Sequence, residues 1–432
     1  MRRLPFLVWC AFILYGSFIP FEFSADPDAV LESLTRARAT PFPRGAVSLS
    51  VSDLLTNVLV FVPFGYLAVD GARGRRFGGG RVREAATAGL GALALATAIE
   101  LGQLFTPGRV ASVLDVLTDV AGAAVGVIAA HGVGWIRFGP GGSRARQLLR
   151  AAPTLVPLGL LALSFVMDAF YPFVLVSSRA AVRTKLSRLG VVRSPWNARR
   201  FWGDVVMDRI VLVGLLAALV RRALERLHAG PSHPAVTAWL ATSVVVGGLE
   251  LGKVVVQGRE PRVEDALLVA AGALAGVTAV PVILGSRLVA ARPARALVVL
   301  AAALLVYAEL TPFRLRTDPA GVASRLAQIE WLPFSAYYWM DIRPTLLDVW
   351  NKALVSGFFG FSVAAAGRGT GQSVAVAGFL AALLLETTQL VLAGRVPSLG
   401  DVLLLGCGAC LGGRAWEAFR ELESPEAETE AA

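Results

Sequence analysis

The stretch ELGQLFTPGRVASVLDVLTDVAGAAVG, residues 100–126, carries a glutamate, an arginine and an aspartate inside long apolar sequence. The arginine lies nine residues after the glutamate, the aspartate six residues further on, and glycines follow the aspartate at seven and eleven residues. The same skeleton returns without a gap as ELGKVVVQGREPRVEDALLVAAGALAG, residues 250–276, and as ETTQLVLAGRVPSLGDVLLLGCGACLG, residues 386–412. An unbroken match of this length in three places identifies an internal repeat.

The three copies share a charged trio and a polar neighbour of the glutamate. A polar side chain at i+3 from a helical glutamate lies on the same face of the helix. The residues are Glu100, Gln103, Arg109 and Asp115 in the first copy; Glu250, Lys253, Arg259 and Asp265 in the second; and Glu386, Gln389, Arg395 and Asp401 in the third.

The composition places the chain among membrane proteins. It has 432 residues, 55% of them hydrophobic and 17% charged, whereas a soluble globular domain has about 25% charged residues. Apolar segments close to the roughly 20 residues that span a bilayer recur along the chain. We predict an all-α polytopic membrane protein with about 12 transmembrane helices as three parallel four-helix repeats. The expected spans are residues 4–21, 54–69, 84–105, 113–136, 155–176, 205–220, 236–256, 266–284, 296–312, 346–365, 374–392 and 399–416.

The repeats define the domains. We expect repeat 1 at residues 1–137, a divergent repeat 2 at 151–286, repeat 3 at 294–416 and an acidic disordered tail at 417–432. The first helix of each repeat ends in a Pro-Phe pair, and a loop long enough for a short interfacial helix follows. Helix one ends, helix two begins, helix three ends and helix four begins at the same membrane face, so the repeated polar residues are expected to gather there.

Helix two supplies further polar residues to this face. It opens with an aspartate, and a second polar residue follows one turn later; the pairs are Asp53 and Asn57, Asp204 and Asp208, and Asp348 and Lys352. We interpret Asp53 as the N-cap of its helix, because aspartate is a preferred residue there. Helix four carries a G-x3-G motif in every copy, which allows another helix to approach closely.

The net charge of +10 does not indicate nucleic-acid binding, because the basic residues lie in loops between apolar spans. Loops rich in Lys and Arg remain cytoplasmic, and such residues lie before helix one and in the loop DGARGRRFGGGRVRE, residues 70–84. We therefore expect both termini in the cytoplasm and the motif face outside. The basic loop at residues 179–200 argues against this orientation.

The stretch DLLTNVLVFVPFGYLAVDG, residues 53–71, precedes the first charged motif. Together these two segments resemble the VanZ-like family of bacterial membrane proteins, which is named for low-level resistance to the glycopeptide teicoplanin. Repeat 1 fits best and repeat 3 is recognisable, with Lys352 in place of the asparagine. Repeat 2 differs most from the family pattern, with Asp208 in place of the asparagine and Lys253 in place of the glutamine. The resemblance implies a protein of the bacterial cytoplasmic membrane that acts in the cell envelope. It implies no particular biochemical mechanism.

Two interpretations of the charged trio are compatible with the sequence, and both can hold at once. In the first, the arginine bridges the two carboxylates of its own copy and closes a helix hairpin. In the second, the polar cluster at the outer face binds the headgroup of a lipid-linked cell-wall precursor or a lipoglycopeptide. The candidate binding residues are Asp53, Asn57, Glu100, Gln103, Arg109, Asp115, Glu250, Arg259, Asp265, Glu386, Gln389, Arg395 and Asp401.

We expect no catalytic residues, cofactor or metal. No histidine or cysteine pair accompanies the trio, and the arginine beside the carboxylates disfavours a hard cation. The leading interpretation is a membrane protein that binds a surface amphiphile, with glycopeptide tolerance as the implied phenotype. The alternatives are a flippase-like permease for a lipid-linked glycan, which Arg209 and Lys352 would favour if they lie inside the membrane, and a structural membrane scaffold.

Overall fold

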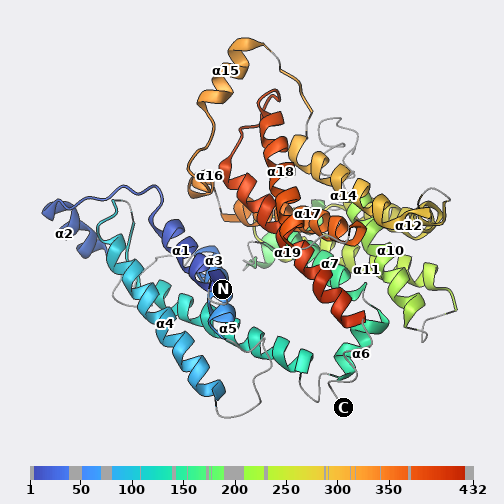
Figure 1. Ribbon diagram of the computed structural model, residues 1–432, viewed down its shortest axis with the longest axis horizontal. Helices are drawn as coiled ribbons and strands as arrows, with labels where there is room; N and C mark the ends of the chain where they lie inside the picture. Colours follow the sequence, from blue (N-terminus) through green and yellow to red (C-terminus); the bar gives the residue numbers. More distant parts are fainter. Residues whose placement is uncertain are drawn as a thin grey trace. The chain divides into compact units, whose positions relative to one another are not determined.

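The structure, a computed structural model, describes residues 4–37, 51–69, 80–107, 109–138, 143–152, 154–171, 175–176, 178–188, 209–227, 232–286, 289, 291–311, 313–316, 318–340, 342–367 and 371–423. These residues are helical apart from turns, irregular segments and isolated bridges (Figure 1). They form two compact units, one of Met1–Arg146 with Ser335–Ile342 and one of Gln147–Phe334 with Arg343–Ala432. Repeat 1 belongs to the first unit, and repeats 2 and 3 belong to the second apart from Ser335–Ile342 of repeat 3.

Each of the expected spans contains a helix. Repeat 1 has α1 (Leu4–Phe18), α3 (Val51–Ala68), α4 (Gly80–Gln103) and α5 (Val113–Phe138). Repeat 2 has α7 (Leu155–Phe170), α10 (Val213–Arg226), α11 (Pro234–Gly252) and α12 (Val263–Gly285). Repeat 3 has α14 (Pro293–Leu310), α17 (Ile342–Ala366), α18 (Gly371–Gln389) and α19 (Leu399–Glu423).

Six helices of the described residues are long and apolar enough to cross a membrane. They lie at Val82–Gln103, Val113–Trp135, Pro234–Val255, Val263–Gly285, Pro293–Leu310 and Leu399–Arg420. Three further apolar helices are shorter: Pro5–Phe18, Leu54–Ala68 and Leu155–Phe170. The chain is thus an all-helical, multi-pass membrane protein, and the full set of 12 spans stays a prediction.

A short helix follows helix one in every repeat, as the loop lengths predict. These helices are α2 (Pro27–Arg36), α8 (Arg179–Arg188) and α15 (Pro319–Ala327). Asp318 caps α15 by accepting a hydrogen bond of 2.7 Å from the Gly321 N–H. The hydrogen bond from Arg316, together with that from Gly321, holds the pKa of Asp318 below its usual range. The remaining short helices are α6 (Ser143–Ala151), α16 (Ser335–Trp339) and the 3-10 turn η4 (Lys253–Val255).

The Pro-Phe pair ends helix one by a left-handed turn. Phe21 has φ of 67° and Phe313 has φ of 55°, a conformation that non-glycine residues adopt rarely. Their backbone N–H groups donate to the carbonyls of Phe18 at 2.6 Å and Leu310 at 2.8 Å. The phenylalanine of the pair therefore has the same backbone conformation and the same type of hydrogen bond in repeats 1 and 3.

Helices two and four of each repeat are in backbone contact along the G-x3-G seam. A Cβ on Gly126 of α5 would overlap the Val62 carbonyl of α3. A Cβ on Gly276 of α12 would overlap the backbone of Gly214 on α10. Gly412 of α19 lies in the same way against α17. The prediction that these glycines admit a close neighbouring helix is confirmed.

Two boundaries differ from the sequence prediction. Asp53 lies within α3, preceded by the helical residues Val51 and Ser52, and so is not its N-cap. α19 continues to Glu423, into the segment predicted as a disordered tail. The Phe361 ring of α17 contacts the rings of Trp416 and Phe419, with centroids 5.2 and 6.2 Å apart, and so anchors this extension.

Some predicted features lie outside the described residues. They are Asp204, Asp208, the glycine-rich part of the basic loop at residues 70–79, and the chain end from residue 424.

Candidate functional site

The repeated arginine donates hydrogen bonds to the carbonyl end of helix one. Arg395 reaches the Thr311 carbonyl at 2.9 Å and the Ala308 carbonyl at 3.0 Å. Arg259 reaches the Asp168 carbonyl at 2.6 Å, at the register of Ala308. The last carbonyls of a helix have no partner within the helix and carry partial negative charge, so a cation stabilises them.

Repeat 1 has the same contact in a longer form. The Arg109 guanidinium lies 3.5 Å from the Ile19 carbonyl, and Ile19 precedes the proline of the Pro-Phe pair as Thr311 does. In repeats 2 and 3 the residue before the arginine is a glycine in the left-handed region, Gly258 with φ of 72° and Gly394 with φ of 82°. Glycine adopts this conformation without steric cost, and the tight turn directs the arginine toward helix one.

The repeated glutamate binds the start of helix four. Glu100 accepts a hydrogen bond of 2.6 Å from the Ser112 N–H, and Glu386 accepts one of 2.8 Å from the Ser398 N–H. Each serine directly precedes helix four of its repeat. A buried carboxylate from helix three thus satisfies a backbone donor at the helix start.

The glutamine of the motif adds a third tie. Gln103 donates to the Ser17 carbonyl at 3.4 Å, and Gln389 donates to the Glu309 carbonyl at 3.5 Å. Gln389 also donates to Glu386 Oε1 at 2.9 Å. The arginine, glutamate and glutamine together hold the ends of helices one, three and four to each other.

The arginine does not bridge the two carboxylates of its own motif in repeats 2 and 3. Within the described part of the chain, Arg259 and Arg395 form no ion pair with Glu250 or Glu386, nor with Asp265 or Asp401. The bridge fails because the turn directs each guanidinium to the end of helix one. In repeat 3 the hairpin of helices three and four is closed instead by the Glu386 carboxylate, which accepts a hydrogen bond from the Ser398 N–H.

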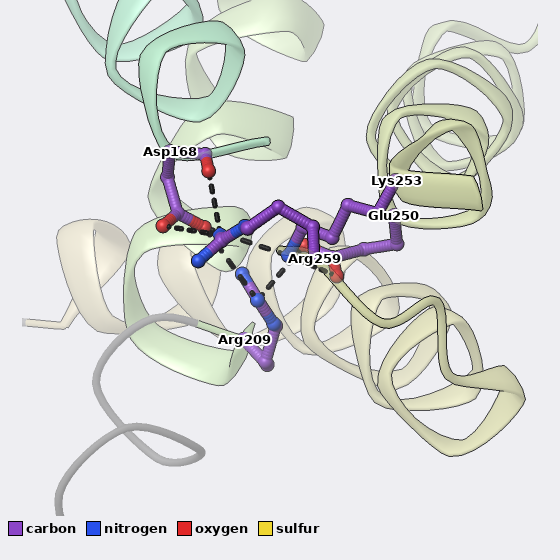
Figure 2. A network of polar contacts seen from close by, with 5 residues as sticks. All are labelled: Asp168, Arg209, Glu250, Lys253 and Arg259. Atoms are coloured by element: carbon purple, nitrogen blue, oxygen red, sulfur yellow. Dashed lines mark hydrogen bonds and ion pairs between the residues drawn. The ribbon is translucent and has the colours of Figure 1, made fainter. Parts of the chain in front are cut away.

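Repeat 2 contains a buried ion network of two carboxylates and three cations (Figure 2). Glu250, which is 2% exposed, pairs with Arg209 at 2.8 Å and with Lys253 at 2.6 Å. Asp168 pairs with Arg259 at 2.9 Å and lies 3.8 Å from Arg209 and 3.6 Å from Lys253. The carboxylates of this network are therefore neutralised by the protein's own cations.

Repeat 3 is arranged differently and is richer in acids. Lys352 of α17 pairs with Asp348 and with Asp401, each at 2.7 Å. Glu309 of α14 is 2% exposed, and its Oε2 atom is buried without a hydrogen-bond partner among the described residues. One carboxylate oxygen from each of Glu309, Glu386 and Asp401 lies within 4.8 Å of the others.

Repeat 1 gathers acids around Asp119 of α5. This side chain is 7% exposed and lies near Glu100 and Asp115, whose negative charges repel it. Its counterparts in repeats 2 and 3 are Val269 and Leu405, which are fully buried apolar residues. At this core position, repeat 1 alone has an ionisable residue.

Two predicted site residues remain at the edge of these clusters. The Asp265 side chain is half-buried in the first turn of α12, and Asn57 is half-buried on α3. Neither side chain forms a hydrogen bond or ion pair with another described residue. The Asp53 side chain lies outside the described atoms.

The repeated motif does not predict three charged residues of these clusters: Asp119, Asp168 and Glu309. Each lies outside the motif positions that all copies share. The available signal is that a charge inside an apolar span is costly and rare, which marks it as paired or functional. Asp119 also lies four residues after Asp115, on the same helix face.

Comparison with known proteins gives a family match in two parts of the chain. The VanZ/LLP1 family model matches residues 4–136 and 296–420, which cover repeats 1 and 3 and together exceed half of the chain. Repeat 2 lies outside both matches. No curated protein and no solved structure matches the chain.

Proposed function

Because the chain belongs to the VanZ/LLP1 family, we propose that it binds the headgroup of an amphiphile at the polar ends of repeats 1 and 3. The proposed ligands are a lipid-linked cell-wall precursor or a lipoglycopeptide. The phenotype that follows is tolerance to glycopeptides such as teicoplanin. Nucleic acid is no partner in this proposal, and the lipid bilayer surrounds the apolar helices.

The proposed setting is the cytoplasmic membrane of a bacterium, with both chain ends inside. The ends of helices one and three and the starts of helices two and four then lie at the outer face. A ligand whose acyl chain lies in the outer leaflet presents its headgroup at this depth. The polar clusters and the headgroup would therefore meet without the ligand crossing the membrane.

The observation that carries the proposal is the buried Asp119. Burying a carboxylate without a partner is costly, so natural proteins pair such groups or use them. The side chain forms no hydrogen bond or ion pair with other described residues, and the charges around it include Glu100 and Asp115. Val269 and Leu405 at the same register indicate that the fold itself does not need an acid there.

The electrostatics favour a ligand that brings positive charge or hydrogen-bond donors. An ammonium or a hydroxyl-rich sugar offers donors to carboxylate oxygens, which are acceptors only when ionised. The carboxylates of repeat 2 do not need a ligand of this kind, because they are already paired with Arg209, Lys253 and Arg259. We therefore assign the binding role to repeats 1 and 3 and a structural role to repeat 2.

The test replaces Asp119 with the residue that repeat 3 uses. Asp119→Leu, a deletion and the wild type are compared in the native host for membrane abundance by immunoblot and for teicoplanin susceptibility. We expect normal abundance, because leucine fits the equivalent core position, together with susceptibility equal to that of the deletion. Glu84→Leu is the control, since Glu84 lies at the opposite end of α4 from Glu100, roughly 24 Å away at 1.5 Å per residue.

Two outcomes contradict the proposal. Wild-type susceptibility of a normally abundant Asp119→Leu protein would show that this carboxylate has no part in binding. A deletion that leaves susceptibility unchanged would remove the glycopeptide phenotype.

A further inference from the structure

We propose that repeat 3 binds a hard divalent cation, such as Ca²⁺ or Mn²⁺, between the carboxylates of Glu309, Glu386 and Asp401. The site is separate from the headgroup-binding role of Asp119 in repeat 1. It contradicts our sequence expectation that no metal binds, and it stands whether or not the proposed function holds.

The spacing of the three carboxylates fits a shared cation. One oxygen from each lies within 4.8 Å of the others. Calcium binds oxygen ligands at about 2.3–2.6 Å, so two oxygens on the same ion can be up to about 5 Å apart. The three acids come from α14, α18 and α19, and the motif contacts fix these helix ends relative to each other.

Glu309 supplies the independent indication of a ligand. Its side chain is almost completely buried, and its Oε2 atom has no hydrogen-bond partner among the described residues. An unsatisfied buried carboxylate oxygen beside two further acids is unfavourable. A bound cation satisfies this oxygen and offsets the repulsion among the acids.

The other two acids keep capacity for a cation. Glu386 accepts hydrogen bonds from the Ser398 N–H at Oε2 and from Gln389 at Oε1. Each carboxylate oxygen has two acceptor positions, so these bonds leave room for a metal ligand. Asp401 Oδ1 is bound by the Lys352 ammonium at 2.7 Å, which competes with a metal ion for this oxygen.

Charge counting separates repeat 3 from repeat 2. In repeat 3, the carboxylates of Glu309, Glu386 and Asp401 lie together, and the described cation Lys352 pairs with one of these three acids. A divalent cation between the acids offsets the repulsion among them. The repeat 2 network has two carboxylates and three cations, so it has no demand for another cation.

The arginine of the motif does not block the site. Our sequence expectation was that an arginine beside the carboxylates disfavours a hard cation. The Arg395 guanidinium instead donates to the carbonyls of Thr311 and Ala308 at the end of α14. It thus holds helix one and leaves the space between the carboxylates to a smaller cation.

The test is a Mn²⁺ titration of the purified full-length protein in detergent micelles, followed by electron paramagnetic resonance of the free ion. We expect saturable binding below about 1 mM, the weak limit for extracytoplasmic calcium modules, and displacement by Ca²⁺. Glu309→Gln should weaken binding by at least about tenfold, the smallest loss that even outer-shell partners of metal sites give. Glu417→Gln is the control, because Glu417 lies on α19 of the same repeat, 16 residues after Asp401 (401 to 417) and so roughly 24 Å away at 1.5 Å per residue.

A variant that should bind Mn²⁺ more tightly distinguishes a specific effect at this site from a general loss of folding. Lys352→Asn, which introduces the residue of repeat 1 at this register, removes the competing ammonium and should tighten Mn²⁺ binding. Glu309→Ala repeats the first test with the residue that repeat 2 has at this register, Ala169. The proposal is overturned if the wild type binds no Mn²⁺, if both Glu309 variants bind like the wild type, or if Lys352→Asn binds more weakly.

Discussion

The ion network of repeat 2 makes a quantitative prediction for Glu250→Gln. The Glu250 side chain is 3% exposed and pairs with Arg209 at 2.8 Å and Lys253 at 2.6 Å. The amide can still accept from one of them, but both cations lose their charge partner and retain only the more distant Asp168. Removing one partner of a buried ion pair costs about 3–5 kcal/mol, because an uncompensated charge stays buried.

The assay is reversible unfolding in mixed micelles, with the free energy of unfolding as the readout. Glu225→Gln is the matched control: it is the same substitution in the same repeat, and its pairs with Arg221 and Arg222 are partly exposed. Such a pair contributes about 0–1 kcal/mol. We expect a loss of at least about 3 kcal/mol for Glu250→Gln and no more than about 1 kcal/mol for the control. Equal losses for the two variants would refute the reasoning that repeat 2 is held by its buried charges.

Two further predictions concern the packing seam and the arginine contact. Gly126→Ala should destabilise repeat 1 by about 1–3 kcal/mol, because its Cβ overlaps the Val62 carbonyl; Gly132→Ala in the same helix, where the Cβ meets open space, should instead stabilise by about 0.5–1 kcal/mol. The pair is compared by thermal unfolding, and a loss of the same size at both positions would contradict the close approach of α3 and α5. Arg395→Ala should destabilise by about 1.5–3 kcal/mol and speed amide exchange at Phe313, and Arg395→Lys should restore little, because a single ammonium does not match two carbonyls as the planar guanidinium does. Unchanged exchange would mean that Arg395 does not hold the end of α14.

The sequence predicts the framework of each repeat because regular spacing determines it. Apolar runs indicate the helices, and three ungapped copies indicate which helix ends share a face. The close contact of helices two and four follows from glycines four residues apart, and the structure has that contact in all three repeats. The arrangement of 12 spans as parallel repeats remains a prediction of the same reasoning.

The partners of the charged residues could not be predicted from the motif. The arginine binds main-chain carbonyls of helix one, which every residue type provides and which no sequence pattern marks. The acids that change the chemistry of each repeat, Asp119, Asp168 and Glu309, stand at positions where the other copies differ. Only the folded arrangement shows that Asp168 meets three cations, whereas Glu309 and Asp119 lie among acids.

The three repeats thus combine a common scaffold with different charge. Repeat 2 replaces the motif glutamine by Lys253 and places Arg209 against Glu250, so its polar cluster is self-contained. The VanZ/LLP1 match leaves out this repeat. The contact of the arginine with helix one is therefore present in every copy, whereas the contact of the glutamate with the start of helix four is present in repeats 1 and 3.

The central claim, that the acidic end of repeat 1 binds an amphiphile headgroup, is tested most directly by native mass spectrometry of the protein purified from its own membrane. We predict a bound amphiphile in the wild type and in Glu84→Leu, and its loss in Asp119→Leu at unchanged thermal stability. The same bound mass in all three proteins, or no bound amphiphile in any, would contradict the account.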